Sequence, residues 1–365
     1  MDKVESDVNG NILNEEYNKY KFYCDTAQTK FKSVNGIKVG FTFYNLPNPF
    51  YGSNYGIAPY QVLTEFPMLY SKTIIKHNQN NNSLKVIDST HYYYSDSCLL
   101  SKIESWNSLG EKNITVIKYP YDYSTSITNE PISQAINMFK ENHIILPIEK
   151  MIFIKHSSED SLLLSSSIMT YTIQSINNKN FIFPKDLYDT KLVTPKQNYI
   201  PSTILNGVFS FDQSIFKRES SIDSYNEFDR MTQMHKENNV NNSYIWGYNN
   251  QYMVIKAVNI DAVSLSTIVN NIQPDFQSFL TGLDDLTDPA KRSQWKLFNN
   301  TLRSGLPPNS RAETFTYLPF IGITSKTDEA GITTYYYYDD FGRLLNVKDE
   351  EGNIVKKYDY HYQGQ

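Results

Sequence analysis

Residues 331–363 read GITTYYYYDDFGRLLNVKDEEGNIVKKYDYHYQ, in which aromatic runs alternate with short segments containing Asp and Gly. The pattern Asp-x-x-Gly occurs at Asp328–Gly331, Asp339–Gly342 and Asp349–Gly352, so that successive aspartates are 11 and then 10 residues apart. Asp favours the start of a turn because its side chain accepts backbone hydrogen bonds, and Gly readily takes the positive φ that closes the turn. We therefore expect a series of similar turns, with positive φ at Gly342 and Gly352.

The segments between these turns have the length and composition of strands. ITTYYYY, RLLNVK and NIVKKYDYHY are rich in Tyr, Val, Ile and Thr, and together they predict an antiparallel meander. Because alternate residues of a strand face opposite sides, Tyr336 and Tyr338 share one face while Tyr335 and Tyr337 share the other. Rings on both faces indicate either a sheet that is covered on both sides or cross-strand ladders on a broad, curved sheet.

The same pattern recurs elsewhere in the chain. DVNGNILNEEYNKYKF from Asp7 shares Asp-x-x-Gly-Asn-Ile and a trailing Tyr pair with DEEGNIVKKYDYHYQ from Asp349, which predicts a repeat family. Between 225 and 258 we align Phe228 and Asp229 with the Tyr-Asp pair of the C-terminal repeat. Further strands are predicted at SLKVIDSTHYYYSD (83–96), KNITVIKYPYDYS (112–124), EKMIFIKHS (149–157), SIMTYTIQS (167–175) and KNFIFPKDL (179–187).

Helical periodicity is confined to two regions. Apolar residues at i, i+3, i+4 and i+7 from Ile132 predict one amphipathic helix, and two apolar stripes, beginning at Leu265 and Trp295, predict a pair of helices docked on the sheet. Asp288 is the expected N-cap of the second helix, with Pro289 at its first position and Gly305 after its end. The fold class is therefore mainly β. We expect a large curved sheet of meandering hairpins with helical insertions at about 131–142 and 261–304.

We expect the chain to divide into an irregular β-rich region, a helical insertion and the C-terminal meander, as parts of one continuous unit. The corresponding ranges are 1–256, 257–307 and 308–365.

The composition and charge of the chain limit the kinds of partner that it can bind. The chain has 365 residues, a net charge of −5 and no Lys/Arg cluster, which disfavours nucleic acid and anionic membranes as partners. It has neither a run of 18 apolar residues nor an N-terminal secretory signal, so the sequence predicts no direct membrane insertion. Cys24 and Cys98 do not form a Cys-x-x-Cys motif, which excludes a zinc site of the usual spacing and leaves either one disulfide or two unpaired thiols.

Common catalytic motifs are missing from the sequence. It contains no Gly-x-Ser-x-Gly, His-Glu-x-x-His, phosphate-binding loop or dinucleotide fingerprint, and Ser53 in YGSNYG lacks the spacing of a nucleophile elbow. Asp339 and Asp340 are adjacent and so face opposite sides of a strand, which makes them a poor glycosidase pair. The Asp-x-x-Gly segments lack the alternating acidic positions of a calcium loop. Single histidines without metal-ligand spacing occur at His77, His91, His143, His156, His235 and His361. We expect no catalytic residue, metal or cofactor.

The segment YYYYDDFGRLLNVKDEEGN resembles the Tyr-x-Tyr-Asp-x-x-Gly-Arg-Leu repeat of bacterial rearrangement-hotspot (RHS) proteins. The residues at the repeat positions are Tyr336, Tyr338, Asp339, Gly342, Arg343 and Leu344, and Asp349 and Gly352 begin the next copy. The order of segments from Ser243 to Gln363 is similar to the C-terminal part of the cell-surface branch of that family. The resemblance implies secretion or surface display and, in larger relatives, a β-sheet shell around a polypeptide.

The chain departs from that family in having few clear repeats, and we expect no toxin domain after the last one. We expect a non-enzymatic β scaffold, extracellular or on the cell surface, that associates with another polypeptide. That polypeptide would be the upstream part of a larger surface protein or a subunit of an envelope complex. A cytoplasmic location is the alternative to export. The alternative function is a glycan-binding or glycan-cleaving module whose tyrosine platforms include Tyr335 and Tyr337.

Overall fold

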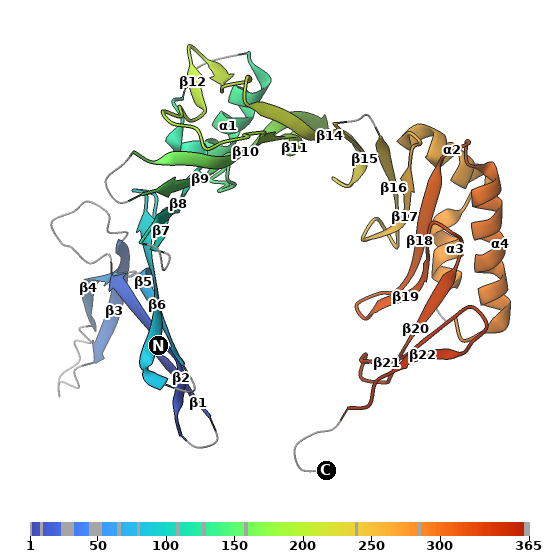
Figure 1. The fold of residues 1–365 in the computed structure, drawn as a ribbon, viewed down its shortest axis with the longest axis horizontal. Coiled ribbons are helices and arrows are strands. Elements are labelled where there is room, and N and C mark those ends of the chain that lie inside the picture. The colour runs from blue at the N-terminus through green and yellow to red at the C-terminus, as the bar shows by residue number, and fades with distance from the viewer. Residues whose placement is uncertain are drawn as a thin grey trace. The chain divides into compact units, whose positions relative to one another are not determined.

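The computed structural model describes residues 2–7, 10–22, 33–43, 53–63, 67–78, 81–106, 110–125, 129–156, 160–237, 240–283 and 286–360. These residues form a mainly β protein with an 18-stranded sheet, two small two-stranded sheets and four α-helices (Figure 1). The predicted fold class is confirmed. Contacts divide the chain into two compact units. The first comprises Met1–Ser124, Ile144–Ser167 and Lys191–Thr203, and the second comprises Thr125–His143, Ile168–Thr190 and Ile204–Gln365.

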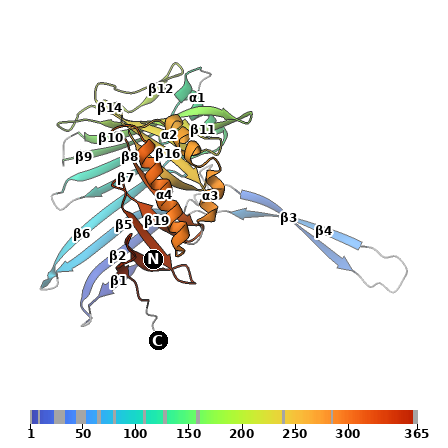
Figure 2. The same ribbon diagram turned by 90° about the vertical axis from the view of Figure 1, so that its right-hand side faces the viewer.

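The first unit is an antiparallel meander in which each strand pairs with the next strand of the sheet. Its strands are β1 (Lys3–Ser6), β2 (Ile12–Phe22), β5 (Pro67–Asn78), β6 (Asn81–Tyr94), β7 (Leu100–Trp106), β8 (Lys112–Lys118) and β9 (Glu149–Lys155). A short 3-10 turn, Pro120–Asp122, follows β8. Because β2 pairs directly with β5, the intervening β3 (Ser33–Phe43) and β4 (Ser53–Leu63) leave the sheet and form a hairpin of their own (Figure 2).

The second unit continues the same architecture. Its strands are β11 (Lys179–Thr190), β14 (Phe216–Tyr225), β15 (Met231–Lys236), β16 (Asn241–Gly247), β17 (Tyr252–Val258), β18 (Arg311–Leu318), β19 (Gly322–Thr327), β20 (Thr333–Tyr338), β21 (Leu344–Lys348) and β22 (Ile354–Lys357). The remaining strands are β10 (Leu162–Ile176), whose two ends belong to different units, and the small β12 (Thr203–Leu205) and β13 (Val208–Ser210). A strand is present in every region predicted in the middle of the sequence, but the one predicted over 112–124 ends at Lys118 and is followed by the 3-10 turn.

Helices occupy the two predicted regions, with one more helix than expected. They are α1 (Pro131–Glu141), α2 (Ala262–Ile272), α3 (Phe276–Gly282) and α4 (Pro289–Gly305). Strands β17 and β18 pair directly, so α2–α4 form an insertion between neighbouring strands. The Asp288 side chain caps α4 at 2.8 Å from the Ala290 amide, as predicted, whereas Gly305 is the last residue of the helix and not the one after it. The short α3 was missed because seven residues display too little periodicity.

The inserted helices cover one face of the second unit's sheet (Figure 1). Trp295 and Leu302 are fully buried together with Leu265 of α2 and Ile255 of β17, so the predicted stripes are core. The Trp295 ring stacks on Phe298 with 5.2 Å between centroids. Burial of such side chains contributes about 1.5–3 kcal/mol each, which makes this cluster a main source of stability for the unit.

A single turn geometry closes hairpins along the chain. In the Asp339 turn, one carboxylate oxygen accepts the backbone N–H groups of Phe341 and Arg343 at 2.9 and 3.0 Å. The Asp339 amide donates to the Arg343 carbonyl at 2.9 Å, and the Gly342 amide donates to the Asp339 carbonyl at 2.9 Å. Gly342 has φ +72° and Gly352 has φ +92°, which confirms both predictions. This is a three-residue loop that closes with a left-handed residue.

The first residue of this turn, the head, is not always Asp. The same pair of backbone bonds occurs with heads Asp7, Ser95, Asn226, Asp328 and Asp349. In the Asp339 hairpin the register of strand pairing shifts between Tyr337 and Tyr338, the two residues before the head, so a β-bulge accompanies the turn. All the other hairpins have a shift at the same place except that of Asp328. The repeat is thus a turn combined with a bulge, and it persists where the Asp-x-x-Gly pattern is lost.

One alignment made from the sequence was wrong. Asn226 accepts the amides of Phe228 and Arg230 at 3.0 Å, and Asp229 has φ +63°. Tyr225 and Asn226 therefore take the places of Tyr338 and Asp339, and Asp229 takes the place of the glycine. The alignment failed because Asn replaces the head and Asp replaces the left-handed residue, and both types tolerate these positions.

Valine in place of Gly342 should destabilise the protein through its backbone. A Cβ there would make only ordinary contacts with Ile321, at 3.7 Å. The backbone, however, has φ +72°, which is unfavourable for a β-branched residue. We expect Gly342→Val to lower the free energy of unfolding by about 1–3 kcal/mol and Gly342→Asn by clearly less. Urea unfolding of the two variants checks this. Equal losses would show that the left-handed conformation is not the cause.

Gly247 offers a steric test of how α3 docks on β16. A Cβ at Gly247 would lie 2.3 Å from Leu280 and 2.6 Å from Val254. Gly247→Ala should therefore overpack this contact and lower the free energy of unfolding by about 1–3 kcal/mol. Gly282→Ala is the matched control, because nothing lies within 4 Å of its Cβ position and Ala favours a helix. A neutral Gly247→Ala would contradict the close packing of α3.

Candidate functional site

Aromatic and cationic side chains form a ladder across five strands of the first unit. The Lys21 amine lies 4.3 Å from the Tyr70 ring centroid, and Tyr70 stacks on His91 at 5.8 Å. His91 meets Trp106 edge-on at 5.0 Å, and the Lys112 amine lies 4.9 Å from the Trp106 ring. Cation–π and aromatic pairs of this kind contribute about 0.5–1.5 kcal/mol each, so the ladder stabilises a sheet with few fully buried apolar residues.

Glu104 neutralises the lysines at one end of the ladder. Its carboxylate lies 3.0 Å from Lys112 and 3.1 Å from Lys102, and it accepts the Tyr93 hydroxyl at 3.0 Å. Burial and the bond to Glu104 raise the pKa of Tyr93. Both lysines and the Tyr93 hydroxyl are therefore paired with Glu104, which gives this carboxylate a structural role.

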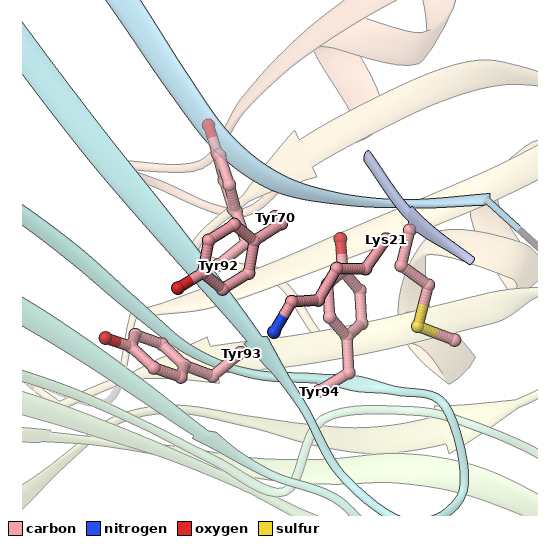
Figure 3. Close-up of a pocket in the computed structure, with 6 residues that line it drawn as sticks. Lys21, Tyr70, Tyr92, Tyr93 and Tyr94 are labelled. Atoms are coloured by element: carbon pink, nitrogen blue, oxygen red, sulfur yellow. The ribbon is translucent and has the colours of Figure 1, made fainter. Parts of the chain in front are cut away.

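At the other end the ladder borders a small pocket (Figure 3). The cavity measures about 150 Å³ and is lined by Lys21, Met68, Tyr70, Tyr92, Tyr93 and Tyr94. Lys19 pairs with Ser71 and Tyr20 with Leu69, so Tyr70 is the extra residue of a β-bulge in β5. Bulges redirect side chains. Tyr70 here is 37% exposed, beside the buried Met68.

A second polar cluster lies inside the first unit, around the fully buried Glu149. One of its oxygens accepts the hydroxyls of Tyr199 at 2.5 Å and Ser166 at 3.0 Å, and the other accepts the amide and hydroxyl of Ser202 at 2.8 and 2.6 Å. The Lys118 amine donates to the Ser202 carbonyl. The carboxylate therefore anchors the segment 191–203 against the strands.

The electrostatics of this cluster oppose acid–base catalysis. Burial, together with the bond to Glu149, raises the pKa of Tyr199, and burial lowers the pKa of the Lys118 amine. A general acid or base must reach a substrate proton, whereas Glu149 has no exposed surface and each of its oxygens has donors in place. Sequence analysis missed Glu149, although an acid within the apolar run IILPIEKMIFI is a recognisable signal of a buried polar network.

The residues of the predicted repeat lie at turns and along strands, and they do not converge on a pocket. Arg343 forms an ion pair with Asp339 at 2.6 Å, and its guanidinium lies 4.7 Å from the Tyr360 ring. The Tyr338 hydroxyl donates to the Ile323 carbonyl at 2.9 Å. Tyr336 is half-buried in β20, and the Leu344 carbonyl accepts the Tyr360 hydroxyl at 2.9 Å. Asp349 and Gly352 form the last turn.

The tyrosine platforms proposed for glycans are not available at the two predicted positions. Tyr335 is only 3% exposed, with the Arg292 guanidinium 5.8 Å from its ring. Tyr337 is half-buried, and the Lys348 amine lies 4.8 Å from its ring. Each ring thus has a cation near one of its faces.

Histidines in the described residues have structural partners. His77 lies 2.5 Å from Glu15, His156 lies 2.9 Å from Glu111, and His235 lies 2.9 Å from Asp223. Within the described ranges, no three His, Cys, Asp or Glu side chains gather closely enough to hold a metal ion. Asp340 is exposed beside the turn head, and Cys98 is an exposed free thiol at the left-handed position of the Ser95 turn. Cys24, His361 and the side chain of Ser53 lie outside what the structure describes.

The first and last strands of the meanders are exposed. All four residues of β1 and all four of β22 are exposed, including Val4 at 54% and Val355 at 59%. Among the described strands, β1 pairs with β2 and β22 pairs with β21. Each therefore presents one edge with backbone groups that no described strand covers.

No protein-family model matches the chain, and no curated protein matches it either. Among solved structures, the crystal structure of TcdB2-TccC3-Cdc42 is 10% identical with a TM-score of 0.40, covering 96% of this chain and 17% of that chain. TcdB2-TccC3 without its hypervariable C-terminal region is 9% identical with a TM-score of 0.39 and the same coverage. The Photorhabdus luminescens Tc holotoxin pore is 8% identical with a TM-score of 0.25, covering 98% and 19% of the two chains. This likeness is too weak to establish a family.

No helix in the described part of the chain is long and apolar enough to span a membrane.

Replacing Glu149 should be costly to stability. In Glu149→Gln the amide nitrogen would face donors that now bind a carboxylate oxygen, so we expect a loss of about 2–4 kcal/mol in the free energy of unfolding. Tyr199→Phe should cost about 1 kcal/mol through one lost hydrogen bond. The exposed Glu227→Gln serves as the control. Unchanged urea midpoints for Glu149→Gln would show that the buried network does not anchor the segment.

Proposed function

We propose that this chain is a non-enzymatic β scaffold whose function is association with another polypeptide. The observation that carries the proposal is the exposed edge of β22, where Ile354 and Val355 are 57% and 59% exposed on consecutive positions. Consecutive strand residues face opposite sides, so neither side of β22 is covered by the described residues. Natural proteins protect such edges or use them to pair with another strand.

The chemistry of the described residues supports association over catalysis. The polar network around Glu149 is buried and fully hydrogen-bonded, and Glu104 neutralises the lysines at the Lys112 end of the aromatic ladder. The net charge of −5 opposes binding to nucleic acid. An extended partner segment would gain main-chain hydrogen bonds along the edge and contacts with exposed apolar side chains.

The repeated turns support the finer proposal that the chain is related to RHS proteins with Tyr-Asp repeats. The Tyr338–Arg343 turn recurs at Tyr225–Arg230 with the same hydrogen bonds despite its different sequence. On this basis we also propose that the protein is extracellular or at the cell surface, and that 257–307 is a helical insertion within one continuous scaffold. The partner would then be an upstream part of a larger surface protein or a subunit of an envelope complex.

The edge can be tested by capture from native cells. We expect tagged protein to retain a specific polypeptide, and Val355→Lys to reduce its recovery about tenfold, since charges on edge strands oppose pairing and tenfold corresponds to about 1.4 kcal/mol. Val193→Lys is the matched control, because Val193 is fully exposed outside any strand. Recovery of no polypeptide, or equal recovery with Val355→Lys and Val193→Lys, would refute the use of this edge.

A further inference from the structure

We propose that the pocket of the first unit, formed by strands β2, β5 and β6, receives one aromatic side chain of the partner polypeptide, next to an acidic residue. This inference rests on the proposed function and names a contact site separate from the β22 edge. The pocket is the one lined by four tyrosines, Met68 and Lys21. Figure 3 shows the Lys21 amine reaching in among the tyrosine rings.

The volume of the pocket is suited to one aromatic ring. The cavity is about 150 Å³, and an apolar cavity of about that volume is known to accommodate benzene. Its walls are the rings of Tyr70, Tyr92 and Tyr94 and the thioether of Met68, which is 7% exposed. Aromatic and sulfur groups favour edge-on and stacked contacts with another ring, so Phe or Tyr suits the space.

The positive charge of Lys21 favours an acidic residue next to that ring. Several lysines of this sheet are paired, such as Lys72 with Glu16 at 3.0 Å and Lys112 with Glu104 at 3.0 Å. Lys21 forms no ion pair with any described residue, and it is the sole charged residue in the lining. Its ammonium is held 4.3 Å from the Tyr70 ring, where a carboxylate beside a bound ring would form a charge-assisted hydrogen bond.

The hydrogen-bonding groups of the pocket disfavour a sugar. The Tyr94 hydroxyl donates to the Leu69 carbonyl at 3.1 Å, and the Tyr93 hydroxyl donates to Glu104 at 3.0 Å. The hydroxyls of a pyranose need several directional partners, and these two donors are already engaged.

Binding of 3-phenylpropionate tests the pocket directly, because this probe carries one ring and one carboxylate. The observable is the methyl resonance of Met68 in protein labelled at methionine methyl groups, assigned with Met68→Leu. We expect 3-phenylpropionate to shift this resonance at concentrations about tenfold lower than phenethylamine, which carries the opposite charge. Lys21→Glu should reverse that order. Lys19→Glu, the same charge change outside the pocket lining, should leave it intact.

Equal affinity for the acid and the amine, or no shift of Met68, would overturn the assignment. So would a shift produced by N-acetylglucosamine at lower concentration than the acid, since it would identify a sugar site. The polypeptide source is tested by capture from native cells, where Lys21→Glu should reduce recovery of the partner and Lys19→Glu should not. Normal recovery with Lys21→Glu, while 3-phenylpropionate still binds the unmodified protein, would assign the pocket to free aromatic acids and leave the β22 proposal standing.

Discussion

The hydrogen bonds at the heads of the repeated hairpin turns are the constraint on which much of this fold depends. At Asp339 one oxygen accepts two backbone amides, which leaves the residue three positions later with a positive φ. The register shift that precedes most of these turns places a bulge at the same point of the hairpin. Bulges increase local twist, so each hairpin fixes the path of the next strand. A long sequence of local pairings then forms with short loops and little loop-closure entropy.

The two units stabilise their sheets in different ways. The second unit covers one face with α2–α4 and buries Trp295, Leu265 and Leu302. The first unit relies on a ladder of rings and lysines and on the buried Glu149 carboxylate, which holds a long segment by hydrogen bonds. A fully bonded buried acid is costly to remove, which explains how an irregular segment keeps one position.

Local sequence signals predicted most of the fold, because most strands of this chain pair with a neighbour in sequence across a short turn. The Gly342 and Gly352 turns and the Asp288 cap followed from residue chemistry. The turns headed by Ser95 and Asn226 escaped detection because the head needs only a side-chain oxygen, and Cys98 and Asp229 take the left-handed position. The pocket depends on a bulge at Tyr70 and on the pairing of distant strands, neither of which is visible in a pattern of residues.

Amide hydrogen exchange of β22 tests the central claim, which is that the unpaired edge of β22 binds a strand of another polypeptide. The comparison is between isolated protein and the assembly recovered from native cells, with residues 354–357 followed beside the interior strand β17. The account predicts fast exchange at β22 in the isolated protein and strong protection in the assembly, with β17 protected in both. Protection of β22 already in the isolated protein, or equally fast exchange in the assembly, would contradict it.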